Sequence, residues 1–417
     1  MKKHMLFLCL FGFAPFSTIA QQTSVLFIGN SYIYTADLPG TLKSLALAGG
    51  DSVYHESSTP GGFSFEQHST NASTLNKIAS RNWDFVVLQQ QSQMPSFPPS
   101  QVAWQTYPFA ETLVDSIKSN YECSEPIFFM TWGRKDGDQA NCGGSPLCTF
   151  ETMQARLRQS YLEMGSDNDA TVAPCGAAWH QMSVDNNSFW SGLYSGDGSH
   201  PSAWGTYLNA CVFYATIFQK SPVGIPYYSN IGQQDAEDLQ QLAEEIVLDS
   251  LSNWYIGHAD VVSNASYTFG PGLTIIFDGS SENATSHEWD FGDGSISNQE
   301  SPQHTFSIGG TVEVSHIAKS ECDADTTVFE IVLNPTGIVK NSLSQVDVLV
   351  NNGTLVVKNV LNSRVKLTLI ELTGREIINS IIESLNTKLI HATTKPGLYL
   401  VKLSDDKQEW TKKIFIP

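Results

Sequence analysis

The first part of the chain alternates short apolar runs with longer amphipathic stretches. Short, mostly apolar runs are typical of strands buried in a parallel sheet, and they occur at Val25–Ile28, Phe85–Leu88, Pro126–Met130 and Ala170–Ala173. The intervening and following stretches have helical spacing, around residues 38–48, 72–80, 101–119, 150–164, 204–219 and 235–253. Alternating strands and helices predict an α/β domain, in which helices cover both faces of a parallel sheet.

The pattern changes near His258, where the helical spacing ends. Residues 258–334 are strand-like and rich in Thr, Ser and Gly, which predicts a small β-sandwich. From residue 335 onward, polar and apolar residues alternate strictly in runs such as Val346–Val350 and Val365–Ile370, which predicts a second antiparallel sandwich. We therefore expect three domains, at residues 21–257, 258–334 and 335–417.

The first 20 residues have the pattern of a signal peptide. A basic start, Met1-Lys2-Lys3-His4, precedes an apolar run from Met5 to Phe16, and small residues follow at Thr18-Ile19-Ala20. We expect cleavage after Ala20. No later segment is a long uninterrupted apolar run, so the mature protein is not expected to span a membrane.

Charge is unevenly spread along this acidic chain. The formal net charge is −19, and segments 1–257, 258–334 and 335–417 carry −12, −11 and +4. An acidic surface disfavours nucleic acid and anionic lipid as partners. Solubility alone also accounts for such a surface.

Six cysteines lie outside the predicted signal peptide, and export permits disulfides. Cys142 and Cys148 bracket a short loop and are the favoured pair. Cys123 with Cys175 is a further pairing, and Cys322, isolated in its region, is expected to be free. No cysteine–histidine spacing resembles a zinc site, and no metal or other cofactor is expected.

Two motifs supply the side chains of a serine hydrolase. The strand at Val25–Ile28 leads directly into Gly29-Asn30-Ser31, and Asp197-Gly-Ser-His200-Pro201 places an acid three residues before a histidine. A serine hydroxyl becomes a nucleophile when a histidine takes its proton, and a carboxylate orients that histidine. Structural alternatives remain for each motif, because Ser31 could cap the following helix and Asp197 and His200 could be ordinary loop residues.

Together these motifs resemble the SGNH (GDSL-like) hydrolase superfamily over residues 23–220, with Gly61-Gly62 and Gln89-Gln90-Gln91-Ser92 between them. The resemblance implies a flavodoxin-like α/β/α fold and metal-free ester hydrolysis. It assigns Ser31 as nucleophile, His200 as general base and then acid, and Asp197 as its orienter. The N–H groups of Ser31 and Gly62 would stabilise the oxyanion.

One motif departs from the superfamily pattern. The usual Gly-x-Asn-Asp block is absent, and glutamines follow the strand Phe85–Leu88 instead. A glutamine amide can donate the same hydrogen bond as asparagine. Gln89 is the expected oxyanion donor, Gln91 is the alternative, and a polar strand end without a catalytic role is the third interpretation.

The two C-terminal segments resemble export-related domains. Residues 260–333 are similar to a PKD domain through Trp289-Asp-Phe-Gly-Asp-Gly294 and Ser301–Phe306. The last segment resembles the C-terminal sorting domain of the type IX secretion system of Bacteroidetes, through Gly374-Arg375-Glu376, Gly397-Leu398-Tyr399 and the terminal Lys-Lys-Ile-Phe-Ile-Pro. This implies the secretion machinery as a partner and a secreted or cell-surface location.

The sequence therefore predicts an exported serine esterase that removes acyl groups, acetyl in particular, from carbohydrate. Lipid or aryl esters are the rival substrates within the same chemistry. The rival from another class is a surface adhesin or glycan-binding protein built on an inactive hydrolase fold.

Overall fold

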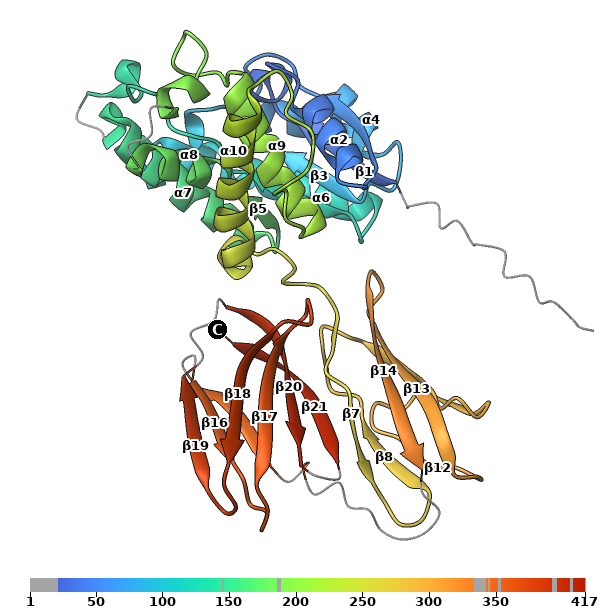
Figure 1. Ribbon diagram of the computed structural model, residues 1–417. Helices are drawn as coiled ribbons and strands as arrows, with labels where there is room; N and C mark the ends of the chain where they lie inside the picture. The colour runs from blue at the N-terminus through green and yellow to red at the C-terminus, as the bar shows by residue number, and fades with distance from the viewer. Residues whose placement is uncertain are drawn as a thin grey trace, which may run out of the picture.

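The structure is a computed structural model that describes residues 22–143, 146–185, 189–333, 343, 346–351, 354–391, 396–405 and 408–416. The predicted signal peptide lies outside the described residues. Figure 1 shows one α/β unit above two β units, which lie beside one another. Within the described residues, no helix combines the length and the apolar character that crossing a membrane requires.

The N-terminal unit is built on a five-stranded sheet in which every pairing is parallel. Its strands are β1 (Thr23–Ile28), β2 (Val53–Ser58), β3 (Phe85–Leu88), β4 (Glu125–Phe129) and β5 (Thr171–Ala173), in the order β2-β1-β3-β4-β5. This is the flavodoxin-like order, so the predicted fold class is confirmed. The sequence pattern missed β2, because this edge strand reads Val-Tyr-His-Glu-Ser-Ser and is mostly half-buried.

Right-handed crossovers explain how helices cover both faces of the sheet. The chain moves one way from β1 to β2 and the opposite way from β2 to β5, so the crossover helices divide between the two faces. One packed group contains α2, α9 and α10, and another contains α3, α4 and α6. The helices are α1 (Ser31–Tyr34), α2 (Leu38–Ala48), α3 (Phe65–Thr70), α4 (Ala72–Ile78), α5 (Pro99–Gln105), α6 (Tyr107–Asn120), α7 (Phe150–Asp167), α8 (Cys175–Val184), α9 (Ala203–Phe218) and α10 (Gln233–Val247).

Short 3₁₀ segments complete this unit, at Met94–Ser96, Gln139–Asn141, Pro146–Cys148, Trp190–Leu193 and Leu248–Trp254. The helix predicted at 101–119 is two helices, α5 and α6, which meet at Thr106. Pro108 lies in the first turn of α6, where its missing N–H is tolerated, but it could not continue α5.

Each C-terminal unit contains two main antiparallel sheets, as the alternating pattern predicts. In the first unit these are β11-β10-β13-β14 and β12-β8-β7, and in the second β15-β16-β19 and β18-β17-β20-β21. The strands of the first unit are β6 (Val262–Ser263), β7 (Ser266–Phe269), β8 (Thr274–Asp278), β9 (Ser281–Glu282), β10 (Ser286–Asp290), β11 (Ile296–Ser297), β12 (Gln303–Thr305), β13 (Gly310–Lys319) and β14 (Ala324–Leu333). Those of the second are β15 (Asp347–Asn351), β16 (Thr354–Lys358), β17 (Val365–Glu371), β18 (Glu376–Ile382), β19 (Thr387–His391), β20 (Gly397–Ser404) and β21 (Glu409–Ile416).

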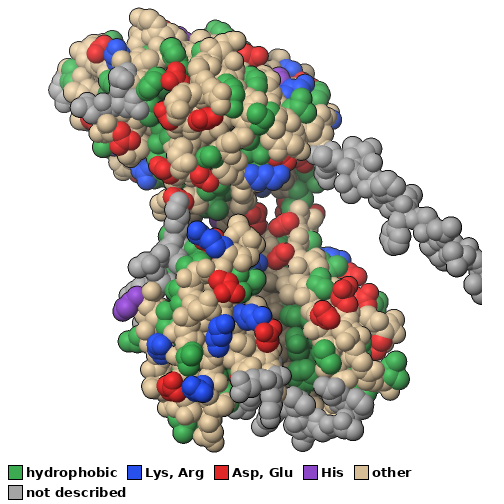
Figure 2. All heavy atoms as spheres, in the orientation of Figure 1, with side chains coloured by type: hydrophobic (Ala, Val, Ile, Leu, Met, Phe, Trp, Pro, Cys, Tyr) green, Lys and Arg blue, Asp and Glu red, His purple; other side chains and the backbone are tan. Residues whose placement is uncertain are grey.

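The charge difference between the two β units is visible on the surface. On the face shown in Figure 2, Lys and Arg side chains gather on the unit formed by β15–β21, whereas Asp and Glu predominate on its neighbour. This agrees with the formal net charges of the two sequence segments, −11 for residues 258–334 and +4 for residues 335–417.

The disulfides confirm one expectation and correct another. Cys142 is bonded to Cys148 as predicted, but Cys322, which was expected to be free, is bonded to Cys123. The partners are 199 residues apart and in different domains, so spacing along the chain carried no signal of this pair. Cys175 is a buried free thiol and not the partner of Cys123.

The Cys123–Cys322 bond lies at the edge of the sheet where the parallel strands begin. Cys123 precedes β4, and Cys322 lies in the turn between β13 and β14. The connecting segment is bonded to both units: His258 contacts Asp169 of the α/β unit at 2.8 Å, and its carbonyl accepts a hydrogen bond from Asn283. The first β unit is therefore attached where the parallel strands begin, which is the opposite end of the sheet from the residue that follows β1, Gly29.

Tryptic mapping without reduction tests this disulfide assignment. We expect peptide 119–134 to be linked to peptide 320–340 until a reductant is added, since these contain Cys123 and Cys322. Peptide 136–156, which holds Cys142 and Cys148, should be lighter by two hydrogens than its reduced form. Recovery of Cys322 as a free thiol from unreduced, alkylated protein would contradict the assignment.

A buried histidine makes the first β unit sensitive to acid. His316 on β13 is fully buried, with Nδ1 2.8 Å from Ser263 Oγ and Nε2 3.1 Å from His287 Nδ1. Burial and the neighbouring His287 lower the pKa of His316 to about 4, against the opposing effect of Asp325 and Asp278. As pH falls from about 6.5 to 4, the unfolded chain binds a proton that the folded domain does not.

We therefore expect the free energy of unfolding of this domain to decrease over that pH range, by at most about 3 kcal/mol. Thermal melts of wild type and His316→Gln at pH 7.5 and 4.5 measure the effect. On acidification, the melting temperature of His316→Gln should fall less than that of wild type. His391→Gln, which changes an exposed histidine of β19, should show the same fall as wild type. Equal acid sensitivity of wild type and His316→Gln would refute this origin.

Candidate active site

Three sequence-predicted residues meet at the edge of the sheet where the strands end. Ser31 follows β1, and its Oγ lies 2.8 Å from Nε2 of His200 in the loop before α9. Nδ1 of His200 lies 2.5 Å from a carboxylate oxygen of Asp197. With Nδ1–H donating to Asp197, Nε2 is left to accept the proton of Ser31. The two motifs, 169 residues apart, thus form one continuous chain of hydrogen bonds.

The loop that carries Asp197 and His200 is ordered by its own backbone bonds. The second carboxylate oxygen of Asp197 accepts the N–H groups of Ser199 and His200, each at 3.0 Å. Gly198 has a φ of 65°, a left-handed conformation that glycine adopts without strain. The N–H of Ser195 bonds to the carbonyl of His200 at 2.8 Å and closes the loop. Its tight turn places the acid and the base side by side.

The same contacts determine the charge state of Asp197. Burial acts to raise its pKa, but the hydrogen bonds to His200 and to the two backbone N–H groups outweigh burial and lower it. The carboxylate is therefore ionised at neutral pH and can stabilise a charged imidazole. The side chains of Asp197 and His200 are 49% and 32% exposed, so the site is open to solvent.

Ser31 does not cap the helix that it begins. The cap of α1 is Asn30, whose side-chain oxygen accepts the N–H of Tyr32. The Asn30 side-chain amide also donates to the carbonyl of Phe63 at 2.9 Å. Asn30 thus joins the loops that follow β1 and β2 and leaves the Ser31 hydroxyl to bond with His200, a role that no sequence motif indicated.

Both polar side-chain atoms of Gln89, the predicted oxyanion donor, have partners inside the protein. Its side chain is fully buried, its oxygen accepts the N–H of Asn30 at 2.8 Å, and its amide nitrogen donates to the carbonyl of Gln90. β3 ends at Leu88, and the side chains of the three glutamines that follow it have different hydrogen-bond partners. Gln90 is also buried and binds Phe65 N–H through its side-chain oxygen. Gln91, the alternative donor, is partly exposed, and its side-chain oxygen accepts the N–H of Gln93 at 3.0 Å. Among the described residues, its side-chain nitrogen has no hydrogen-bond partner.

The predicted glycine lies in a turn of unusual backbone conformation. Gly62 has a φ of 71° and is exposed after β2. Within the described part of the chain, neither its N–H nor that of Ser31 has a hydrogen-bond acceptor. Both N–H groups are thus available to a ligand, as oxyanion donors must be.

His68 supports the loop after β1, which contains Gly29 and Ser31, through a hydrogen bond. It is fully buried, with Nε2 2.9 Å from the carbonyl of Gly29 and Nδ1 2.9 Å from Thr74 Oγ1. Burial lowers the pKa of His68, although the Gly29 bond acts in the opposite direction. His68 is therefore a neutral structural residue.

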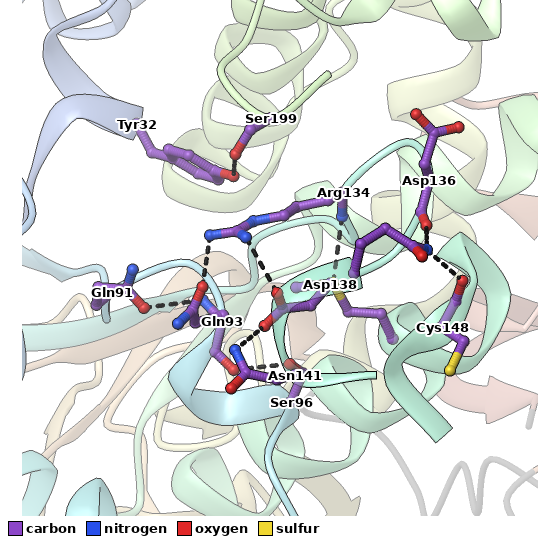
Figure 3. Close-up of polar contacts among 12 residues, drawn as sticks. Tyr32, Gln91, Gln93, Ser96, Arg134, Asp136, Asp138, Asn141, Cys148 and Ser199 are labelled. Carbon is purple, nitrogen blue, oxygen red and sulfur yellow. Dashed lines mark hydrogen bonds and ion pairs between the residues drawn. The ribbon is translucent and has the colours of Figure 1, made fainter. Parts of the chain in front are cut away.

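Arg134 connects the loops after β3 and β4 beside this site. Figure 3 shows its guanidinium group between Gln93 and Asp138, near the ring of Tyr32. One nitrogen donates to Gln93 Oε1 at 2.5 Å and another to the buried Asp138 at 3.3 Å. The next residue, Lys135, donates its N–H to the carbonyl of Gly198 at 2.9 Å. No cluster of side chains suited to a metal ion is present among the described residues.

Family models match two parts of the chain. A PKD domain model matches residues 260–332, and a secretion system C-terminal sorting domain model matches residues 339–417. No curated protein matches the chain significantly.

Several solved structures are similar to the chain. A DUF4886 family protein from Bacteroides uniformis is 18% identical, with a TM-score of 0.47 over 55% of this chain and 95% of its own. A protein described as an SGNH hydrolase, from Slackia heliotrinireducens, is 25% identical, with a TM-score of 0.39 over 47% and 100%. A variant acetyl-xylooligosaccharide esterase from Geobacillus is 13% identical, with a TM-score of 0.34 over 48% and 95%. The chain thus consists of an α/β domain of flavodoxin-like strand order, a PKD domain and a secretion sorting domain.

Proposed function

We propose that the α/β domain is a serine ester hydrolase that acts through an acyl-enzyme. The observation that carries this proposal is the hydrogen-bonded chain from Ser31 Oγ through His200 to Asp197. Its distances and order are those of a nucleophile, a base and an orienting carboxylate. If Asp197 and His200 were ordinary loop residues, their alignment with a serine hydroxyl at the end of a parallel strand would not be expected.

In the proposed reaction, His200 Nε2 removes the proton of Ser31 as Oγ attacks the ester carbonyl. The ionised Asp197 stabilises the imidazolium that forms. His200 then gives this proton to the departing alkoxide oxygen, which leaves an acyl group on Ser31. The same nitrogen then deprotonates a water molecule, which attacks that acyl group. The bond between the acyl carbon and Ser31 Oγ breaks, His200 returns the proton to Oγ, and the carboxylic acid leaves.

The negative charge on the carbonyl oxygen needs donors that are in place before the reaction. The N–H groups of Ser31 and Gly62 and the side-chain amide of Gln91 are the proposed donors. They come from the loops after β1, β2 and β3, which are neighbours in the sheet. These loops are held together by Asn30, which bonds to Gln89 and Phe63.

Acetyl and other small acyl esters of carbohydrate are the proposed substrates. The exposed triad permits approach by an ester on a bulky carrier, and the exposed Tyr34, near Gly61, offers an aromatic face. The sorting domain indicates export, which brings the protein to extracellular glycans. Lipid and aryl esters, or glycan binding without hydrolysis, are alternative outcomes of the test.

Substitution of the triad tests the reaction class. Acetate release from acetylated xylan and pectin, and hydrolysis of p-nitrophenyl acetate, should fall to background in Ser31→Ala. Activity should fall by about 10²- to 10⁴-fold in Asp197→Asn, because the amide cannot stabilise the imidazolium. Ser69→Ala, which removes an exposed hydroxyl on α3, should retain wild-type activity.

A folded wild-type protein that hydrolyses no ester on this panel would rule out the hydrolase. Saturable glycan binding without product would support the adhesin instead. Full activity in Ser31→Ala would show that another residue is the nucleophile.

The glutamines provide a separate test of the oxyanion donors. Gln91→Ala should lower kcat by about 10- to 10³-fold with little change in melting temperature, since it removes a donor from a partly exposed loop. Gln89→Ala should lower the melting temperature, because it leaves the buried N–H of Asn30 without its acceptor. If Gln91→Ala has wild-type kcat, the assignment of Gln91 is wrong.

A further inference from the structure

Ser199, the residue before the proposed base, is held by two aromatic side chains. The hydroxyl of Tyr32 lies 2.7 Å from Ser199 Oγ, and the indole N–H of Trp132 donates to the Ser199 carbonyl at 3.0 Å. Figure 3 shows the Tyr32 hydroxyl directed at Ser199. In the proposed hydrolysis, Ser199, Tyr32 and Trp132 carry out no chemical step. The two hydrogen bonds that Tyr32 and Trp132 make to Ser199 therefore need another explanation.

Tyr32 links this contact directly to the nucleophile. It follows Ser31 in the chain, and its side chain is only 3% exposed. Its hydroxyl therefore connects the residue after the nucleophile with the residue before the base. This connection is independent of the hydrogen bond between Ser31 and His200 themselves.

A stack of rings fixes the position of Tyr32. Its ring lies parallel to that of Trp132 at a centroid distance of 4.9 Å, and Trp132 lies parallel to Trp179 at 3.9 Å. Trp179 is in turn bonded through its indole N–H to Asn209 on α9, at 2.9 Å. The buried stack is thus anchored in the core, whereas the loop that it supports is exposed.

The contact that needs support is the one between the loops of the nucleophile and the base; beside it, the ring of Tyr32 meets the ring of His200 edge-on at a centroid distance of 5.4 Å. Ser31 and His200 are joined by one hydrogen bond between partly exposed side chains. Catalytic geometry must be held to within about 0.5 Å, and a displacement of about 1 Å can cost about 10²-fold in rate. Burial raises the pKa of Tyr32, so its hydroxyl stays protonated and available for the bond to Ser199.

We propose that Tyr32 and Trp132 are positioning residues that act through Ser199 to hold His200 in register with the Ser31 nucleophile. Tyr32 holds the side chain of Ser199, and Trp132 holds its backbone. This inference rests on the proposed function, because it assumes that Ser31 and His200 react as a pair.

The test measures the reactivity of Ser31 with a fluorophosphonate probe, which needs an activated serine but no particular acyl substrate. Second-order labelling rates and kcat are compared for wild type, Tyr32→Phe, Ser199→Ala and the double variant. Tyr32→Phe keeps the ring and its stacking and removes only the hydroxyl. Trp132→Phe tests the backbone contact in the same assay.

Tyr207→Phe is the matched control for the loss of a buried tyrosine hydroxyl. Tyr207 is fully buried on α9, and its hydroxyl bonds to Gln240 and to the carbonyl of Tyr227. The Tyr207→Phe variant should lower the melting temperature at least as much as Tyr32→Phe does, but its Ser31 should be labelled at the wild-type rate.

We expect Tyr32→Phe and Ser199→Ala each to slow labelling and kcat by about tenfold or more, with KM unchanged. The double variant should be no slower than the slower single variant, because both changes remove the same bond. Wild-type labelling rates in Tyr32→Phe, or fully additive losses in the double variant, would overturn the positioning role. If wild type is not labelled at Ser31 at all, the proposed nucleophile fails, and this inference fails with it.

Discussion

The hydrogen bond between Ser31 Oγ and His200 Nε2 is the contact on which a catalytic interpretation of this protein depends. It joins residues 169 positions apart, one at the end of β1 and one in the loop before α9. Neither side chain is deeply buried, so the bond itself contributes little to holding them together. Their alignment comes from the surrounding structure: Asn30 and His68 hold the serine loop, and backbone bonds to Asp197 hold the histidine loop.

The two ends of the parallel strands carry different features. The strand ends carry the triad and the loops that contribute backbone N–H groups, as expected for an open α/β sheet. The strand starts carry the attachment of the PKD domain, through the Cys123–Cys322 bond and contacts of His258. The attachment therefore lies away from the strand ends that carry Ser31, Asp197 and His200.

Several features followed from local pattern because each depends on residues close in sequence. Short apolar runs such as Phe85–Leu88 are typical of buried strands, and the observed β3 has the same bounds. The Asp197-to-His200 spacing places both side chains on one tight turn, and the Cys142–Cys148 pair closes a short loop. Where the local signal was mixed, as in the polar edge strand β2 and the divided helix α5–α6, the prediction missed the element or its break.

The sequence by itself determined the fold class, the three-part organisation and the identity of Ser31, Asp197 and His200 as the candidate triad, because hydrophobic period and short motifs are local properties of the chain. Only the tertiary structure decided which hydrogen bonds engage Gln89 and Gln90, which cysteine pairs with Cys123 and which aromatic residues contact Ser199. Those outcomes depend on which way a chain turns after Leu88 and on contacts between residues far apart in sequence. Such contacts exist only once the strands have been brought into one sheet, and no local pattern records them.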